Sequence, residues 1–217
     1  MNTVTRTPTT ETAILQVQDL TFAYPDQPPL AAVASATIGA GVTLLFGDTG
    51  SGKSTVLRIM AGVQPAGGRL TLSGVRLDQG AEAYRRNVFF VDPATTVFDQ
   101  ATARACTASL REGDADFDEL AWQELVEGFS LTPHIDKPMY MLSTGSRRKV
   151  WLASALASGR ALTLLDEPTG ALDAGSIRCL WRVLRERMKA SERAVVIASA
   201  ERIDQVPLAG TIELPLV

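Results

Sequence analysis

A glycine-rich segment of eight residues constrains the fold of this chain more than any other part of its sequence. The preceding run, Val42–Phe46, is apolar apart from Thr43, which is typical of a strand buried on both faces. Residues 47–54 then read Gly-Asp-Thr-Gly-Ser-Gly-Lys-Ser, a full match to the pattern G-x-x-x-x-G-K-[ST]. A helix is expected from Lys53 to about Ala61. This order of strand, loop and helix predicts a phosphate-binding loop.

The residue types in this loop suit a nucleotide. Glycines let the backbone curl so that successive N–H groups point at phosphate oxygens, and the helix presents its positive end to the same charge. Lys53 is expected to reach the β- and γ-phosphates, and the Ser54 hydroxyl to ligate Mg²⁺. The alternative, a glycine-rich turn without a ligand, is disfavoured because the motif is complete and lies between strand and helix. The expected nucleotide contacts are Gly47, Asp48, Thr49, Gly50, Ser51, Gly52, Lys53, Ser54 and Thr55.

A second apolar strand ends in two acidic residues. Ala161–Leu165 is followed directly by Asp166 and Glu167. Asp166 is expected to hold Mg²⁺, and Glu167 to polarise the attacking water as a general base. Acids often follow strands, so this signal gains its weight from the phosphate loop. Together they predict Lys53, Asp166 and Glu167 as the catalytic residues.

Further buried strands alternate with helices along the chain, which predicts an α/β fold with a parallel central sheet. The acidic stretch Glu112–Asp116 is expected to be a loop between two helices. The other expected strands are 14–20, 36–38, 68–72, 88–91, 194–198 and 211–214, and the other expected helices lie within 100–131 and at 145–158 and 176–189.

Composition excludes several classes of protein. The net charge of −3 over 217 residues gives no basic excess for a dedicated nucleic-acid binder. Two cysteines and one histidine exclude a disulfide scaffold and a Cys-rich zinc site. No apolar run approaches the about 18–20 residues of a membrane span. Residues 1–12 are polar and threonine-rich, and they are expected to form a solvated tail rather than a secretory signal. The chain is therefore expected to be cytosolic unless another chain brings it to a membrane.

Three segments together resemble the ATP-binding cassette (ABC) ATPases. Residues 142–149 read Leu-Ser-Thr-Gly-Ser-Arg-Arg-Lys, similar to that family's Leu-Ser-Gly-Gly-Gln signature, and like it they precede a helix and the Asp-Glu strand. Gly170–Asp173 resembles the family's D-loop. Tyr24 stands where the family often has an aromatic residue that stacks on adenine. The resemblance covers about residues 14 to 200.

The resemblance implies a P-loop NTPase core with a parallel central sheet, an N-terminal antiparallel β portion and an inserted α-helical subdomain. It assigns residues 13–217 to an ABC nucleotide-binding domain, with 13–92 and 158–217 as the core and β portion and about 93–157 as the helical subdomain. ATP and Mg²⁺ are the implied cofactors.

The resemblance also implies partners. In the family the signature closes on ATP bound by a second nucleotide-binding subunit, so Ser143, Gly145 and Asp173 are expected to act across a homo- or heterodimer. A transmembrane permease is the other implied partner, which would place the chain in the cytoplasm on the inner face of the cell membrane. Nucleic acid is not an expected partner.

The sequence departs from the family pattern at three places. The signature has Thr144 and Ser146 in place of glycine and glutamine. Asp92 stands near the expected position of the Q-loop glutamine, where it could ligate Mg²⁺ but adds a negative charge. Ala200 occupies the place of the switch histidine, and the single histidine, His134, lies before the signature in a region where a surface role is expected.

These features favour an ATP-hydrolysing subunit that powers a separate membrane transport subunit. The alternative is an ATP-binding switch with slow or no hydrolysis, which the missing His and Gln support. A third class, the soluble ABC proteins of DNA repair or translation, is disfavoured because the chain has neither a long coiled coil nor a second cassette. The basic run Arg147–Lys149 is expected to be a solvated face, and Trp122, Trp151 and Trp181 are expected to be core or partner-facing.

Overall fold

The computed structural model of the chain describes residues 13–25, 29–188 and 192–214. The predicted solvated tail, residues 1–12, lies outside the described residues, as does Lys189 at the end of the predicted helix 176–189. Within the described residues the strands form two sheets, one parallel and one antiparallel.

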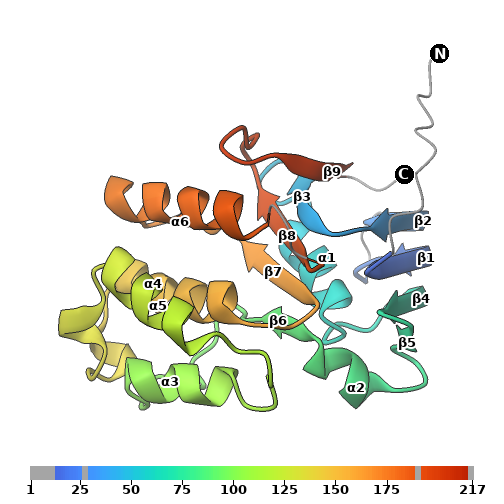
Figure 1. Cartoon of the computed structure of the whole chain (residues 1–217). Coiled ribbons are helices and arrows are strands. Elements are labelled where there is room, and N and C mark those ends of the chain that lie inside the picture. Colours follow the sequence, from blue (N-terminus) through green and yellow to red (C-terminus); the bar gives the residue numbers. More distant parts are fainter. Residues whose placement is uncertain (1–12, 26–28, 189–191, 215–217) are drawn as a thin grey trace.

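The parallel sheet has five strands in the order β6-β7-β8-β3-β9 (Figure 1). Every neighbouring pair runs parallel, and β9, which contains the predicted strand residues 211–213, lies at an edge. The predicted α/β fold with a parallel central sheet is therefore confirmed. Its strands are β3 (Gly41–Phe46), β6 (Val88–Phe90), β7 (Leu162–Asp166), β8 (Ala194–Ser199) and β9 (Leu208–Glu213).

The antiparallel sheet has the order β2-β1-β4-β5 and is the predicted N-terminal β portion. Its strands are β1 (Leu15–Phe22), β2 (Ala31–Ile38), β4 (Gly67–Leu72) and β5 (Val75–Arg76). Strand β2 begins five residues earlier than the predicted strand 36–38, because it pairs with β1 along most of its length. Leu15, Val17 and Leu20 of β1 are buried, so this sheet turns one face to the core.

The helices fill the space between and beside the sheets. They are α1 (Lys53–Met60), α2 (Ala81–Arg86), α3 (Ala103–Leu110), α4 (Glu119–Gly128), α5 (Thr144–Ala157) and α6 (Ala174–Arg187), with 3₁₀ turns η1 (Thr132–His134) and η2 (Met139–Met141). Helix α2 was not predicted, because its six residues are too few to show a periodic pattern. Tyr84 fixes α2 in place because its buried hydroxyl donates a hydrogen bond to the carbonyl of Met60, 2.8 Å away. None of the helices in the described ranges combines the length and apolar character needed to cross a bilayer.

Both faces of the parallel sheet are buried, each in its own cluster of apolar side chains. On β8, Val195 and Ile197 belong to the cluster that includes α4, α5 and α6. Val196 and Ala198 belong to the cluster that includes α1 and the antiparallel sheet. This two-sided burial explains the apolar runs in the sequence, and it places α1 between the two sheets (Figure 1).

Helices α3, α4 and α5 pack together as the predicted inserted helical portion. Its exact boundaries, residues 93 and 157, stay a prediction. The predicted acidic loop 112–116 lies between α3 and α4, and within it the side chain of Asp114 is only 3% exposed. Its carboxylate accepts hydrogen bonds from the Ser158 hydroxyl at 2.6 Å and from the Gly159 backbone N–H. Asp114 thereby connects the helical portion to the chain that enters β7.

Helix α4 provides a matched pair of leucines for a stability test. Leu125 is 2% exposed and Leu120 is 74% exposed. We expect Leu125→Ala to lower the free energy of unfolding by about 2–5 kcal/mol, because it removes buried methyl groups and leaves a cavity. The control, Leu120→Ala, should change it by less than about 0.5 kcal/mol. Urea titration followed by circular dichroism measures both; equal effects would contradict the packing described here.

Candidate nucleotide-binding site

The glycine-rich loop connects β3 to α1 in a conformation that few other residues could adopt. Gly50 and Gly52 have φ angles of 82° and 93°, in the left-handed region that favours glycine. A Cβ atom at Gly52 would also collide with the side chain of Leu30. No side chain caps the start of α1, so the first N–H groups of the helix keep their capacity to bind an anion.

Lys53, the first residue of α1, is buried although its side chain carries a charge. Its Nζ donates hydrogen bonds to the carbonyl oxygens of Gly47, at 2.7 Å, and Asp48, at 3.0 Å. It also lies 3.3 Å from Oε1 of Glu167. The ammonium group therefore has acceptors on two sides, and the carboxylate of Glu167 lies next to the phosphate loop.

Glu167 follows β7 with a φ of 42°, an uncommon angle for a residue with a side chain. This backbone turn aims the carboxylate at the neighbouring strand ends. Its Oε1 accepts a hydrogen bond from the backbone N–H of Ala200, 2.9 Å away, just past β8. Ala200 therefore contacts the expected general base through its backbone, although it lacks the imidazole that the resemblance leads one to expect at this position.

The carboxyl ends of β3, β7 and β8 surround an open cavity of about 430 Å³. This is the edge of a parallel sheet where ligands commonly bind. The cavity brings together a lysine ammonium, several hydroxyls and three carboxylates, which are groups suited to phosphate and to Mg²⁺. Its lining residues are Thr49, Gly50, Lys53, Ser54, Asp166, Glu167, Thr169, Gly170, Ser199, Ala200 and Glu201. The predicted catalytic residues and the predicted ligand Ser54 are among them, and their roles stay predictions.

Tyr24 lies on the antiparallel side, next to α1. Its hydroxyl is 2.6 Å from Oγ1 of Thr55, and its ring meets the ring of Phe22 edge-on, with the centroids 5.0 Å apart. The side chain is partly exposed. The ring is thus held beside the phosphate loop, and its predicted stacking on adenine is left as a prediction.

Asp92 follows β6, and both of its carboxylate oxygens are engaged. Oδ2 accepts a hydrogen bond from Nε of Arg58 at 2.8 Å, and Oδ1 accepts one from the backbone N–H of Ala94 at 2.9 Å. The hydrogen bond from Arg58 holds the pKa of the Asp92 carboxyl below its usual range, although partial burial opposes this. A ligand role for Asp92 stays a prediction, and it would use a second lone pair on an oxygen that is already bonded.

Gly170, the first residue of the D-loop segment, lines the cavity, whereas Ser143, Gly145 and Asp173 do not. Ser143 caps α5, since its Oγ accepts a hydrogen bond from the N–H of Ser146. Gly145 packs so closely on Ala171 that a Cβ would collide with the carbonyl oxygen. Asp173 caps α6 and pairs with Lys149 of α5 at 2.5 Å. The hydrogen bond from Lys149, followed by those from Ser176, holds the pKa of the Asp173 carboxyl far below its usual range.

The basic run 147–149 is not the solvated face that was expected. Arg147 donates to the carbonyl of Met139 and to Asp99, each at 2.7 Å. Arg148 donates to the carbonyl oxygens of Glu167, at 2.5 Å, and Gly170. These partners are distant in sequence, so a local pattern of charges could not reveal them. Arg148 thus supports the backbone turn that carries Glu167, a role that sequence reasoning missed.

The other sequence expectations concern the tryptophans and the histidine. Trp122 and Trp181 are buried in the core, and Trp151 is partly buried against it. His134 lies in η1 on the helical portion, where its Nδ1 is 3.3 Å from Nζ of Lys137.

Known proteins resemble this chain in sequence, which shows its family, and in fold. The family model described as ABC transporter matches residues 34–170. The cytochrome c biogenesis ATP-binding export protein CcmA of Paramagnetospirillum magneticum is 35% identical over 165 residues, covering 74% of this chain and 76% of that protein. The taurine import ATP-binding protein TauB of Pseudomonas fluorescens is 31% identical over 201 residues, covering 91% and 75%.

A solved structure of an ATP-binding subunit of an ABC transporter has the same fold. It superposes with a TM-score of 0.73 over 86% of this chain and 79% of that chain, at 23% identity. The predicted fold class and family are both confirmed.

Lys53 provides the direct test of the phosphate loop. We expect Lys53→Ala to weaken ATP binding by more than about tenfold, because it removes a buried ammonium group from the loop. Equilibrium binding of a fluorescent ATP analogue measures this. Lys137→Ala, which removes a lysine on the helical portion, should bind as the unchanged chain does. Equal binding by both variants would refute the loop as a nucleotide site.

Proposed function

The chain belongs to the ABC transporter family, and from this premise we propose that it is the ATP-binding and ATP-hydrolysing subunit that powers a separate membrane transport subunit. The observation that carries the proposal is the shared cavity at the carboxyl ends of β3, β7 and β8. There Lys53 and Glu167 lie 3.3 Å apart, and Ser54 and Asp166 line the same space.

The proposed chemistry is hydrolysis of the bond between the β- and γ-phosphates of ATP. The backbone of the phosphate loop surrounds the phosphates, and Lys53 turns from its carbonyl acceptors toward the β- and γ-phosphates. Ser54 and Asp166 are the residues proposed to hold Mg²⁺, which when bound neutralises part of the phosphate charge. Glu167 takes a proton from the attacking water, with its carboxylate oriented by the N–H of Ala200.

The proposed catalytic unit is a homo- or heterodimer. Ser143 and Gly145 lie outside the cavity of their own subunit, which supports their proposed role at ATP held by a second subunit. In that arrangement Asp173 lies near the dimer interface. ATP binding closes the dimer and hydrolysis reopens it. Within each subunit, residues 13–92 and 158–217 are the proposed core, and about 93–157 the proposed helical subdomain.

A specific observation favours the alternative function, an ATP-binding switch with slow or no hydrolysis. At the switch position only the backbone of Ala200 contacts Glu167, so no imidazole is available there to contact the γ-phosphate. The two functions differ in the rate of turnover and share the same fold and site.

An exposed apolar patch supports a membrane partner. Val97 is 83% exposed, and Tyr140 and Met141 are also exposed. The segments that carry them are joined by a hydrogen bond from the N–H of Tyr140 to the carbonyl of Asp99, at 3.0 Å. We name Val97, Tyr140 and Met141 the apolar patch. We propose that it docks a transmembrane permease subunit, which places the chain in the cytoplasm at the inner face of the membrane.

Steady-state hydrolysis distinguishes the proposed function from the switch. We expect the purified chain to release inorganic phosphate from Mg-ATP, and Glu167→Gln to reduce the rate by at least about a hundredfold while retaining ATP binding, because the general base is lost. The measurement is repeated with the membrane protein that co-purifies with the chain. Tight Mg-ATP binding with no turnover above Glu167→Gln in either preparation would reject hydrolysis and leave the switch.

The apolar patch makes a separate prediction. We expect the double variant Val97→Glu, Tyr140→Glu to lose association with the membrane subunit, because two charges would be buried at the interface without partners. Co-purification from detergent-solubilised membranes measures the association, and ATP binding by the isolated variant should be unchanged. Leu120→Glu is the control, since Leu120 is also largely exposed but lies on α4. Retention of the membrane subunit by the double variant would exclude this patch as the docking site.

A further inference from the structure

The ion pair between Arg58 and Asp92 lies beside the candidate site and has no role in the proposed hydrolysis of ATP. The register of the sheet places Asp92 there, because Phe90 of β6 pairs with Leu164 of β7. Asp92 lies two residues after Phe90, and Asp166 lies two residues after Leu164. The two aspartates therefore stand at matching positions on adjacent segments of this chain. A second carboxylate thus follows the strand beside β7, at the same edge of the sheet as Asp166 and Glu167.

Helix α1 places Arg58 on the same side. Arg58 is four residues after Ser54, so the two side chains leave the helix on one face. Its Nε donates to Oδ2 of Asp92 at 2.8 Å. The pKa of the Arg58 guanidinium is raised above its usual value, chiefly by this hydrogen bond and against partial burial, with smaller contributions from the charge of Asp92 and from Tyr24 and Asp166. The guanidinium is therefore within electrostatic reach of both aspartates.

The geometry makes Arg58 and Asp92 a neutral unit. The backbone N–H of Ala94 fixes the second oxygen of Asp92, so the carboxylate is held against α1. Without Arg58, its charge would add to those of Asp166 and Glu167 beside the space proposed for a triphosphate. Like charges in such a site oppose anion binding.

We propose that Arg58 is a positioning residue that neutralises Asp92, so that the nucleotide site tolerates a further carboxylate near the expected position of the Q-loop glutamine. The inference rests on the proposed ATP-binding function. It predicts that loss of Arg58 lowers the affinity for nucleotide because Asp92 is left unpaired, and not because a contact between Arg58 and the nucleotide is lost.

The prediction distinguishes this role from that of an ordinary surface ion pair. The two side chains are 36% and 32% exposed, and pairs of that kind contribute little to stability. A pair with only a structural role would leave nucleotide affinity unchanged when Arg58 is removed. An arginine that binds phosphate directly would lower the affinity on removal, whatever residue stands at position 92.

The experiment is a set of three variants, Arg58→Ala, Asp92→Gln and the double variant. Binding of a non-hydrolysable ATP analogue with Mg²⁺ is measured by isothermal titration calorimetry, so the readout is affinity rather than turnover. We expect Arg58→Ala to raise Kd about tenfold, because the unpaired carboxylate of Asp92 would repel the triphosphate. The proposal leaves the Asp92 carboxylate bonded to Arg58 rather than to Mg²⁺, so Asp92→Gln alone should bind at least as tightly as the unchanged chain. The double variant should bind within about twofold of it.

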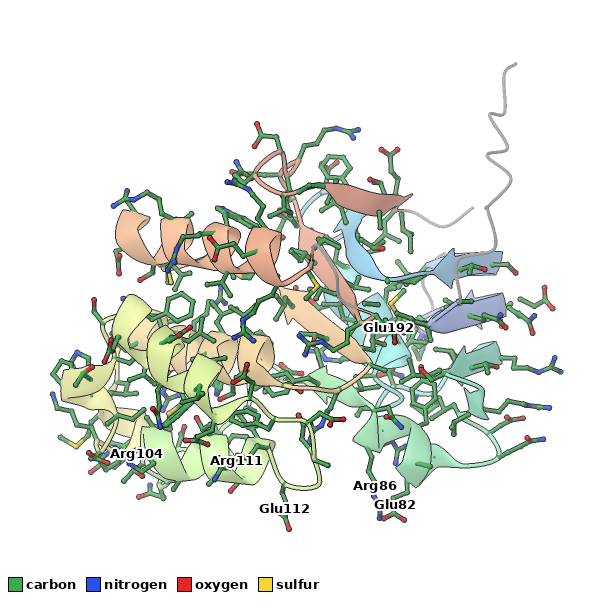
Figure 2. All side chains as sticks on the ribbon, viewed as in Figure 1. Glu82, Arg86, Arg104, Arg111, Glu112 and Glu192 are labelled. Carbon is green, nitrogen blue, oxygen red and sulfur yellow. The ribbon has the colours of Figure 1, made fainter. Side chains whose placement is uncertain are left out.

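Arg104→Ala is the matched control. Arg104 forms a similar pair with Asp136, with Nε 2.9 Å from Oδ1, on the outer side of the helical portion (Figure 2). Its loss should not change nucleotide affinity. Circular dichroism and thermal unfolding establish that each variant is folded, and rescue by the double variant is itself evidence that position 58 is not needed for folding.

Each outcome supports or overturns the proposed role of Arg58. Loss of affinity in Arg58→Ala that is restored in the double variant supports the proposal. No loss in Arg58→Ala, or a loss that Asp92→Gln does not restore, overturns it while leaving the proposed ATP binding intact. Failure of the unchanged chain to bind the analogue would reject the proposed function first, and the inference with it.

Discussion

The parallel sheet is buried on both faces, and the positions of the candidate site residues depend on that burial. Alternate side chains of β8 enter separate cores, one with α5 and α6 and the other with α1 and the antiparallel sheet. Helix α1 is therefore fixed from two sides. Because the phosphate loop is the short connection between β3 and α1, fixing both of these elements defines the path of the loop. The glycines of the loop supply the positive φ angles that this path requires.

Charged contacts, rather than apolar packing, connect the loops around the site. Lys53 contacts the carboxylate of Glu167, and Arg148 donates a hydrogen bond to the backbone carbonyl oxygen of the same residue. Lys149 and Asp173 join the starts of α5 and α6. These contacts are directional and few, so they fix orientations that apolar burial leaves open. The sheet sets the location of the site, and the ion pairs set the direction in which its side chains point.

Sequence reasoning succeeded where the signal is local. The phosphate-loop pattern specifies its own strand, loop and helix, and residues 42–60 follow it closely. It failed where a role depends on a distant partner. The carboxylate of Asp114 is buried against Ser158, and Arg147 pairs with Asp99; in the sequence these residues resemble ordinary loop and surface charges. Helix α2 was missed for a related reason, since six residues are stabilised by the contacts of Tyr84 rather than by their own pattern.

Ion pairs hold the segment of residues 92–99 at both ends. Asp92 is bound to Arg58 of the helix after the phosphate loop, and Asp99 to Arg147 of the helix after the signature. Val97 lies between them. A ligand whose binding at Val97 strains the contact at Asp92 changes the affinity for nucleotide by some factor, and thermodynamic linkage requires the nucleotide to change the affinity for that ligand by the same factor. Any coupling of the two binding equilibria through this segment is therefore reciprocal, whichever of them is perturbed first.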